Sequence, residues 1–217
     1  MDNRSTDGGT TLTSQPPADR LELRHAATDR ATIVVVPERT FLAIDGVGAP
    51  TASDFQYAGQ ILRQVEANLR QRLRRDRTVE SRSPVIESAW WIHPELPPDE
   101  TAEAFVDRSA WHWQQMIEVP LTAAETDITA AIDEVRQGAG RPVPLVRAIS
   151  FAEGQSAQIL HLGGAATEVD SVRKLYQAIA DAGLRARGHL HQIHLAEATR
   201  VPADRVRSIL RLPIEPA

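Results

Sequence analysis

The sequence contains no cysteine, and this absence excludes several kinds of site at once. Without thiols the chain forms no disulfide, no thiolate metal site and no cysteine nucleophile. It also has no run of the roughly 18 apolar residues that a membrane span requires. The polar N-terminal stretch lacks the apolar segment of a secretory signal. These absences predict a cytoplasmic protein that has no membrane partner.

Basic residues are also scarce relative to acidic ones. Lysine and arginine number 24 against 29 aspartates and glutamates, which gives a formal net charge of −5. Binding to nucleic-acid phosphates calls for the opposite balance. The arginine-rich stretch at residues 70–77 is interrupted by Asp76 and is better explained as the solvated face of a helix. We therefore expect a small-molecule partner and no direct binding to nucleic acid.

Aromatic residues make up only 5% of the chain, yet all four tryptophans fall in two short segments. These are SAWWIHP at 88–94 and SAWHWQQM at 109–116, which we interpret as the two strands of an antiparallel hairpin. The rings could fill a core, or they could line a pocket for a flat aromatic ligand. On the second interpretation, the candidate rings are Trp90, Trp91, Trp111 and Trp113.

Strand alternation limits how these rings are arranged. It places Trp111 and Trp113 on one face, whereas Trp90 and Trp91 point to opposite faces. Only one of the latter pair is then expected to line a cleft. If Trp113 contacts the ligand, Trp113→Ala should weaken binding more than tenfold and leave the fold intact.

The rest of the chain shows a recurring order of elements. Residues 1–30 are predicted to be a disordered leader. A strand, an amphipathic helix from Ser53 to about Arg75 and the tryptophan hairpin follow. A linking helix is predicted at 122–138, and then two strands, VPLVRAISFAE and SAQILHLGG, a helix from about Glu168, another strand and a terminal short helix from Pro202.

This recurrence predicts an α+β fold built from a duplicated strand-helix-strand-strand module. The half-modules span about 31–120 and 140–217. Their two antiparallel sheets are expected to meet around a pseudo-twofold ligand cleft.

Three segments carry a resemblance to a known family. They are FLAIDGVGAP at 41–50, the tryptophan hairpin, and GHLHQIHLAEATRVPADRVRSILRLPI at 188–214. Together they resemble GyrI-like small-molecule-binding proteins, with a domain at 31–217. The double tryptophan and the Trp-x-Trp strand are similar to a stand-alone branch that hydrolyses the cyclopropane ring of DNA-alkylating antibiotics of the yatakemycin and duocarmycin type. The resemblance implies no cofactor and a role in self-resistance or detoxification. It also implies an aromatic cage, whose candidate ligand contacts here are Trp90, Trp91, Trp111, Trp113, Met116 and Tyr57.

The sequence departs from this family on its last matching strand. Gln192 stands where the family commonly has glutamate, and His194 where it commonly has tyrosine. A carboxylate can bind a cation or act as a general base, whereas an amide only orients groups by hydrogen bonds. The glutamine therefore puts cation binding in doubt and excludes base catalysis by residue 192. Gln192 and His194 are the catalytic candidates, as guides for a water, and His194 is expected to titrate near its ordinary pKa of about 6.5.

Several alternatives stay open at this stage. Glu87 and Glu118 on the hairpin are other candidate bases, and His189, His191 and His161 could form part of a metal site, although no metal is expected. The protein could also sequester flat hydrophobic compounds without turnover, or modulate a larger protein such as a gyrase. The sequence does not decide between a monomer and a dimer.

Overall fold

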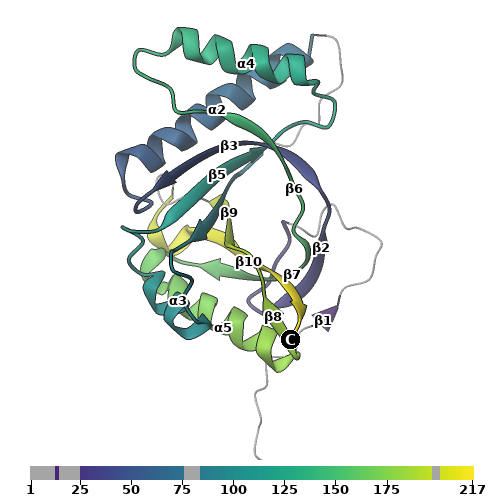
Figure 1. Ribbon diagram of the computed structural model, residues 1–217, viewed down its shortest axis with the longest axis vertical. Coiled ribbons are helices and arrows are strands. Elements are labelled where there is room, and N and C mark those ends of the chain that lie inside the picture. Colours follow the sequence, from purple (N-terminus) through teal and green to yellow (C-terminus); the bar gives the residue numbers. More distant parts are fainter. Residues whose placement is uncertain (1–12, 15–24, 76–83, 197–200) are drawn as a thin grey trace, which may run out of the picture.

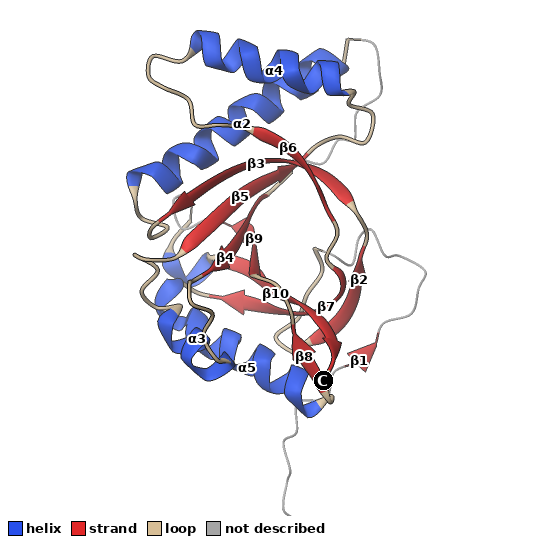
Figure 2. Cartoon of the chain, in the orientation of Figure 1, coloured by secondary structure: helices blue, strands red, loops and turns tan. Residues whose placement is uncertain are grey.

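The computed structural model describes residues 13–14, 25–75, 84–196 and 201–217. Its fold confirms the predicted α+β class, with helices on the outside of an antiparallel sheet that curls into a half-barrel (Figures 1 and 2). The first module consists of β3 (Arg39–Val47), α2 (Ser53–Leu73), β4 (Ile86–Trp91) and β5 (His112–Glu118). The second consists of β7 (Gly154–Leu162), α5 (Glu168–Asp181), β9 (Leu190–Ala196) and β10 (Arg207–Pro216).

The two modules join edge to edge through β4 and β9, which pair antiparallel with Ser88 opposite Gln192. The two predicted sheets therefore continue into each other. The remaining elements are β1 (Thr13–Ser14), β2 (Thr32–Val36), α3 (Pro98–Ala104), α4 (Glu125–Gly138), β6 (Arg147–Phe151) and β8 (Leu184–Ala186). In the described residues the strand order is β1-β2-β7-β10-β9-β4-β5-β3-β6, and β8 pairs with β10. Helices α2 and α4 lie at one end of the molecule, and α3 and α5 at the other (Figure 1).

Both faces of the central strands are buried, but against different groups. On β4, Ile86 and Trp90 join the main core under the helices, whereas Ala89 belongs to a smaller apolar cluster inside the half-barrel. Alternation along an extended strand produces this division. The helix-bearing face and the interior of the half-barrel are therefore two separate environments. The parity of a residue, that is, its odd or even position along the strand, decides which of the two its side chain enters.

Helix α2 forms because its apolar residues recur at helical intervals. The predicted positions Ile61, Leu62, Val65, Leu69 and Leu73 are all buried against the sheet. Arginines from the predicted solvated face include Arg72, which pairs with Glu134 of α4 at 3.4 Å. The linking helix α4 packs on α2 and begins at Glu125, because the backbone of Ala124 is still extended.

The C-terminal segment differs from the prediction. In place of a terminal helix, a three-residue 3-10 turn at Ala203–Arg205 precedes β10, which pairs with both β7 and β9. A strand buried on both faces shows no clean polar and apolar alternation, and Pro213 argues against a strand from sequence alone. The structure also adds the short helix α3 to the proline-rich connection of the hairpin.

Part of the predicted leader, residues 1–12 and 15–24, lies outside the described residues. The described parts contact the sheet. Strand β1 pairs in parallel with β2, and the Ala26 carbonyl accepts a hydrogen bond from Gln158. Among the described residues, no helix combines the length and apolar character needed to cross a bilayer.

Candidate functional site

The structure does not gather the predicted ligand-contacting residues into one cage. Trp90, Trp91 and Trp111 border one pocket, which we call the tryptophan pocket. Trp113 and Tyr57 border a different one, beside Pro142 and Pro144. Within this set, Trp90, Trp111 and Trp113 are each no more than 2% exposed and form part of the main core.

Met116 is a correction to the predicted cage. Its position on β5 has the opposite parity to Trp113, so its side chain enters the interior of the half-barrel. There it packs with Phe41, Ala43 and Ala89 and is fully buried.

The packing of Trp113 argues against the expectation that Trp113→Ala leaves the fold intact. The centroid of its ring lies 5.2 Å from that of Phe55 in an edge-to-face arrangement, and the ring covers Gly46 on the neighbouring strand. Truncation of a large buried ring costs roughly 3–5 kcal/mol. Trp113→Ala would therefore disturb the fold as well as any ligand.

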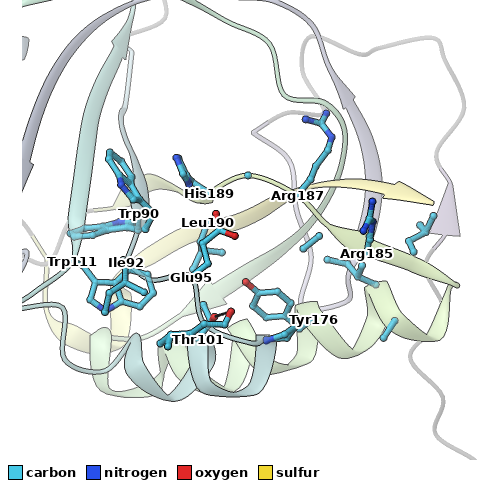
Figure 3. Close-up of a pocket in the computed structure, with 18 residues that line it drawn as sticks. Trp90, Ile92, Glu95, Thr101, Trp111, Tyr176, Arg185, Arg187, His189 and Leu190 are labelled. Carbon is cyan, nitrogen blue, oxygen red and sulfur yellow. Dashed lines mark hydrogen bonds between the residues drawn. The ribbon is translucent and has the colours of Figure 1, made fainter. Parts of the chain in front are cut away.

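The tryptophan pocket lies between the hairpin, α3 and α5 and has a volume of about 400 Å³ (Figure 3). Strand alternation predicts that only one of Trp90 and Trp91 lines a pocket, but both border this one, and Trp91 is the last residue of β4. Trp91 stacks on His189 with ring centroids 4.5 Å apart, and Tyr176 of α5 closes the opposite wall. The buried indole nitrogen of Trp111 has no hydrogen-bond partner among the described residues.

Gln192 and His194 border another pocket, between the N-terminal parts of α2 and α5, which we call the interhelical cleft. It lies beside the β4–β9 pair and has a volume of about 270 Å³. Its apolar wall includes Phe55, Ile86 and Val206. Small-molecule sites commonly combine such walls with a few convergent polar groups.

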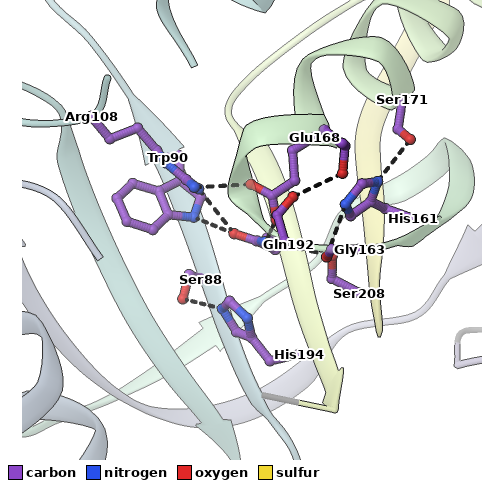
Figure 4. Close-up of polar contacts among 12 residues, drawn as sticks. Ser88, Trp90, Arg108, His161, Gly163, Glu168, Ser171, Gln192, His194 and Ser208 are labelled. Carbon is purple, nitrogen blue, oxygen red and sulfur yellow. Dashed lines mark hydrogen bonds and ion pairs between the residues drawn. The ribbon is translucent and has the colours of Figure 1, made fainter. Parts of the chain in front are cut away.

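The polar groups at the floor of this cleft form one connected network (Figure 4). Arg108 donates to Glu168 at 2.9 Å and to the side-chain oxygen of Gln192 at 3.2 Å. The same oxygen accepts from the indole N–H of Trp90 at 3.1 Å, and the Gln192 amide donates to Glu168. Gln192 is thus fully engaged with protein groups and fixes Trp90 and Arg108 in place.

Arg108 is held by aromatic rings as well as by hydrogen bonds. Its guanidinium carbon lies 4.7 Å from the Trp90 ring centroid and 4.1 Å from that of Phe105, a cation–π arrangement. Burial lowers the pKa of Arg108, while the adjacent Glu168 carboxylate raises it. Gln115 also borders the cleft. The buried Nε of Arg108 and the buried Oε1 of Gln115 have no hydrogen-bond partner among the described residues.

His194 differs from the expectation of ordinary titration. Burial lowers its pKa to about 3, and the charges of Arg108 and Arg63 act in the same direction. The imidazole is therefore neutral near pH 7 and cannot serve as a cationic acid. Its Nε2 lies 3.0 Å from the Ser88 hydroxyl, which fixes the ring against β4.

The other titratable candidates lie inside the half-barrel. His191 is held between Glu87, at 3.1 Å, and Glu153, at 2.9 Å, and Glu153 also pairs with Arg211 at 2.7 Å. Glu87, a candidate base, is thus committed to this network on the sheet face opposite the cleft. The other candidate base, Glu118, pairs with Arg39.

The histidines of the metal hypothesis are not brought together. His189 stacks on Trp91, His191 belongs to the half-barrel network, and His161 contacts Ser171 at 2.9 Å. In the described part of the chain, no group of three or more histidine, aspartate or glutamate side chains is arranged to hold a metal ion.

Sequence reasoning does not single out Arg108 or Glu168. They are 60 positions apart, so no local pattern links them. Two weak signals exist. Arg108 is a lone cation between Phe105 and Trp111, and Glu168 begins a helix, where a carboxylate is readily explained by the helix dipole alone.

No protein-family model matches the sequence, and no curated protein does. Solved structures do match. An uncharacterized conserved protein from Listeria innocua superposes with a TM-score of 0.76 at 25% identity, over 91% of this chain and 98% of that one. A hydrolase from Listeria innocua gives a TM-score of 0.73, with the same identity and coverage.

A more distant structure shares the fold alone. The C-terminal domain of EcmrR superposes with a TM-score of 0.55 at 9% identity, covering 87% of this chain and 98% of that domain. These neighbours share the α+β fold of this chain, which is the fold that the resemblance implies.

Proposed function

We propose that the protein is a hydrolase that binds a flat hydrophobic compound in the interhelical cleft and adds water to a strained cyclopropane. The observation that carries this proposal is the network at the cleft floor, where Arg108 lies beside apolar walls and a neutral His194. The resemblance to hydrolases of DNA-alkylating antibiotics supports the substrate class. One structural neighbour at 25% identity is a hydrolase.

The reaction suits this arrangement because the substrate is already an electrophile. A water oxygen bonds to the cyclopropane carbon, and the bond between that carbon and the dienone ring breaks. The released electron pair moves to the carbonyl oxygen, which becomes a phenolate. The water loses one proton and the phenolate gains one, so the product is heavier by one water.

The residues of the cleft have distinct parts in this step. The positive charge of Arg108 stabilises the phenolate as it develops, in surroundings with little water to screen it. His194 accepts a hydrogen bond from the attacking water and orients it. Gln192 is a positioning residue, because its contacts are with Arg108 and Trp90.

Arg108→Gln should reduce kcat/KM by about 100-fold, the usual effect of losing a group that stabilises developing negative charge. Protein dialysed against a chelator would be incubated with a cyclopropane-bearing alkylator, and water addition followed by mass spectrometry. Arg136→Gln, on the exposed face of α4, is the matched control and should leave the rate unchanged. Wild-type turnover that Arg108→Gln leaves intact would show that the chemistry lies elsewhere.

A second candidate function is sequestration without turnover. The cleft favours it in one respect, since the Gln192 amide is engaged and His194 is a weak base. Stoichiometric binding by wild-type protein, with the compound recovered at its original mass, would establish a trap and overturn the enzymatic proposal.

A further inference from the structure

We propose that the Arg108–Glu168 ion pair sets the charge selectivity of the interhelical cleft, so that it accepts uncharged or anionic aromatic compounds and rejects organic cations. The inference deepens the proposed function and rests on the cleft being the ligand site. It concerns the charge of the ligand, which the tests of turnover do not address.

The carboxylate of Glu168 is the negative group of the cleft, but its oxygens are already engaged. Oε2 accepts from Arg108 at 2.9 Å and Oε1 accepts from Gln192. The side chains of Arg108 and Glu168 are only 3% and 4% exposed. A cationic ligand would have to displace a buried guanidinium before it could use this charge, and a broken buried pair costs roughly 3–5 kcal/mol.

The cleft offers a cation no uncommitted carboxylate. Among the described residues that line it, Glu168 is the only acidic one, and its carboxylate is paired with Arg108. Gln115, Gln192 and the neutral His194 contribute polar groups without charge. An organic cation would lose its hydration in this apolar space without gaining a carboxylate partner. The guanidinium of Arg108 stays beside the ligand and can stabilise a phenolate, the anion that the proposed reaction produces.

The position of the carboxylate explains how this chain differs from the pattern it resembles. The strand position that the family commonly fills with glutamate holds Gln192 here, and the carboxylate is supplied by the first residue of α5. Arg108, from the connection before β5, then neutralises it. The chain therefore keeps a carboxylate in the cleft while withdrawing its charge from the ligand.

Four proteins test this inference: wild type, Arg108→Gln, Glu168→Gln and the double variant. Three probes of nearly equal shape are 2-naphthamide, 2-naphthoate and 2-naphthylmethylammonium, each titrated by calorimetry at pH 7.5. Wild type should bind the ammonium at least tenfold more weakly than the amide. Arg108→Gln should strengthen ammonium binding at least tenfold, and Glu168→Gln should strengthen naphthoate binding at least tenfold.

The double variant is the matched control for burial and shape. It removes both charges and should reverse the gains of each single variant, when the affinity of each charged probe is divided by that of the amide for the same protein. If Arg108→Gln does not fold, as judged by circular dichroism, the comparison of Glu168→Gln with the double variant still decides the outcome. Ala165→Trp, which fills the cleft from an exposed position, should abolish binding of the amide.

The outcomes separate this inference from the proposed function. The amide could bind in the cleft while the ammonium and naphthoate affinities do not change among the four proteins as expected. The charge inference is then overturned and the ligand site stands. If no probe binds wild type, or Ala165→Trp changes nothing, the cleft is not the ligand site and both fail.

Discussion

Gly46→Ala is expected to lower the free energy of unfolding by about 3 kcal/mol or more, the upper range for overpacking a core. Gly46 of β3 lies directly opposite Trp113 of β5, and the indole ring covers the Gly46 backbone. A methyl group there would stand 2.1 Å from the Trp113 ring. Because β3 and Phe55 confine the ring, the added atom cannot be accommodated by a simple rotation. Urea unfolding followed by far-UV circular dichroism measures the loss.

Two further variants make this prediction specific. Gly138→Ala, at the end of α4, places its methyl group in open space and should change stability by less than about 1 kcal/mol, as helix propensity allows. Trp113→Leu should restore part of the stability of Gly46→Ala, because it removes the atoms that clash. A Gly46→Ala protein as stable as wild type would show that the ring can move and that this pairing is loose.

The sequence predicts those parts of the fold that depend on local periodicity. The spacing of Ile61, Val65 and Leu69 predicts α2, and the recurrence of strand, helix and strands predicts the duplicated α+β architecture. The sequence does not predict the full length of strand β10, because both of its faces are buried and it contains Arg211 and Pro213, which are unusual in a central strand. Burial on two sides removes the alternation on which a sequence-based assignment depends.

The candidate site is less predictable because it depends on contacts between distant segments. Strand alternation puts Gln192 and His194 on one face, and the resemblance implies that this face borders the ligand; their functional roles stay predictions. The tryptophans, however, are close in sequence yet divided between two pockets. Strand parity alone could have separated Met116 from Trp113. No local pattern could have found Arg108 opposite Glu168, because folding brings these residues together across 60 positions.

The half-barrel network illustrates the same limit and carries the second large expected effect. His191→Gln should lower the free energy of unfolding at pH 7 by roughly 3–5 kcal/mol, because it leaves two buried carboxylates without the cation between them. His191 lies between Glu87 and Glu153, and all three side chains are at most 3% exposed. Arg211 still pairs with Glu153 in the variant, so Glu87 and Glu153 are affected unequally.

The pH dependence of stability distinguishes this charge effect from a packing defect. Burial alone would lower the pKa of His191, but Glu153 and Glu87 outweigh it and raise the pKa to about 9. Between the ordinary value of 6.5 and about 9, the folded state holds a proton that the unfolded state has lost. The contribution of protonated His191 to the free energy of unfolding is therefore fully present below pH 6.5 and is lost as the pH rises through 9. Urea unfolding at pH 6, 7.5 and 9 should show this decline in wild type.

The variants should divide according to that mechanism. His191→Gln should be less stable at pH 6 and should lack the alkaline decline, whereas His93→Gln, at an exposed position, should follow wild type. On the acid side, burial would raise the pKa of Glu153, but His191 and Arg211 hold it at about 2. Stability from Glu153 is thus lost as the pH falls from 4.5 towards 2. If His191→Gln kept the alkaline decline of wild type, the proton responsible would belong to another group. The charge of His191 would then not be what joins Glu87 of β4 to Glu153, which lies in the turn between β6 and β7.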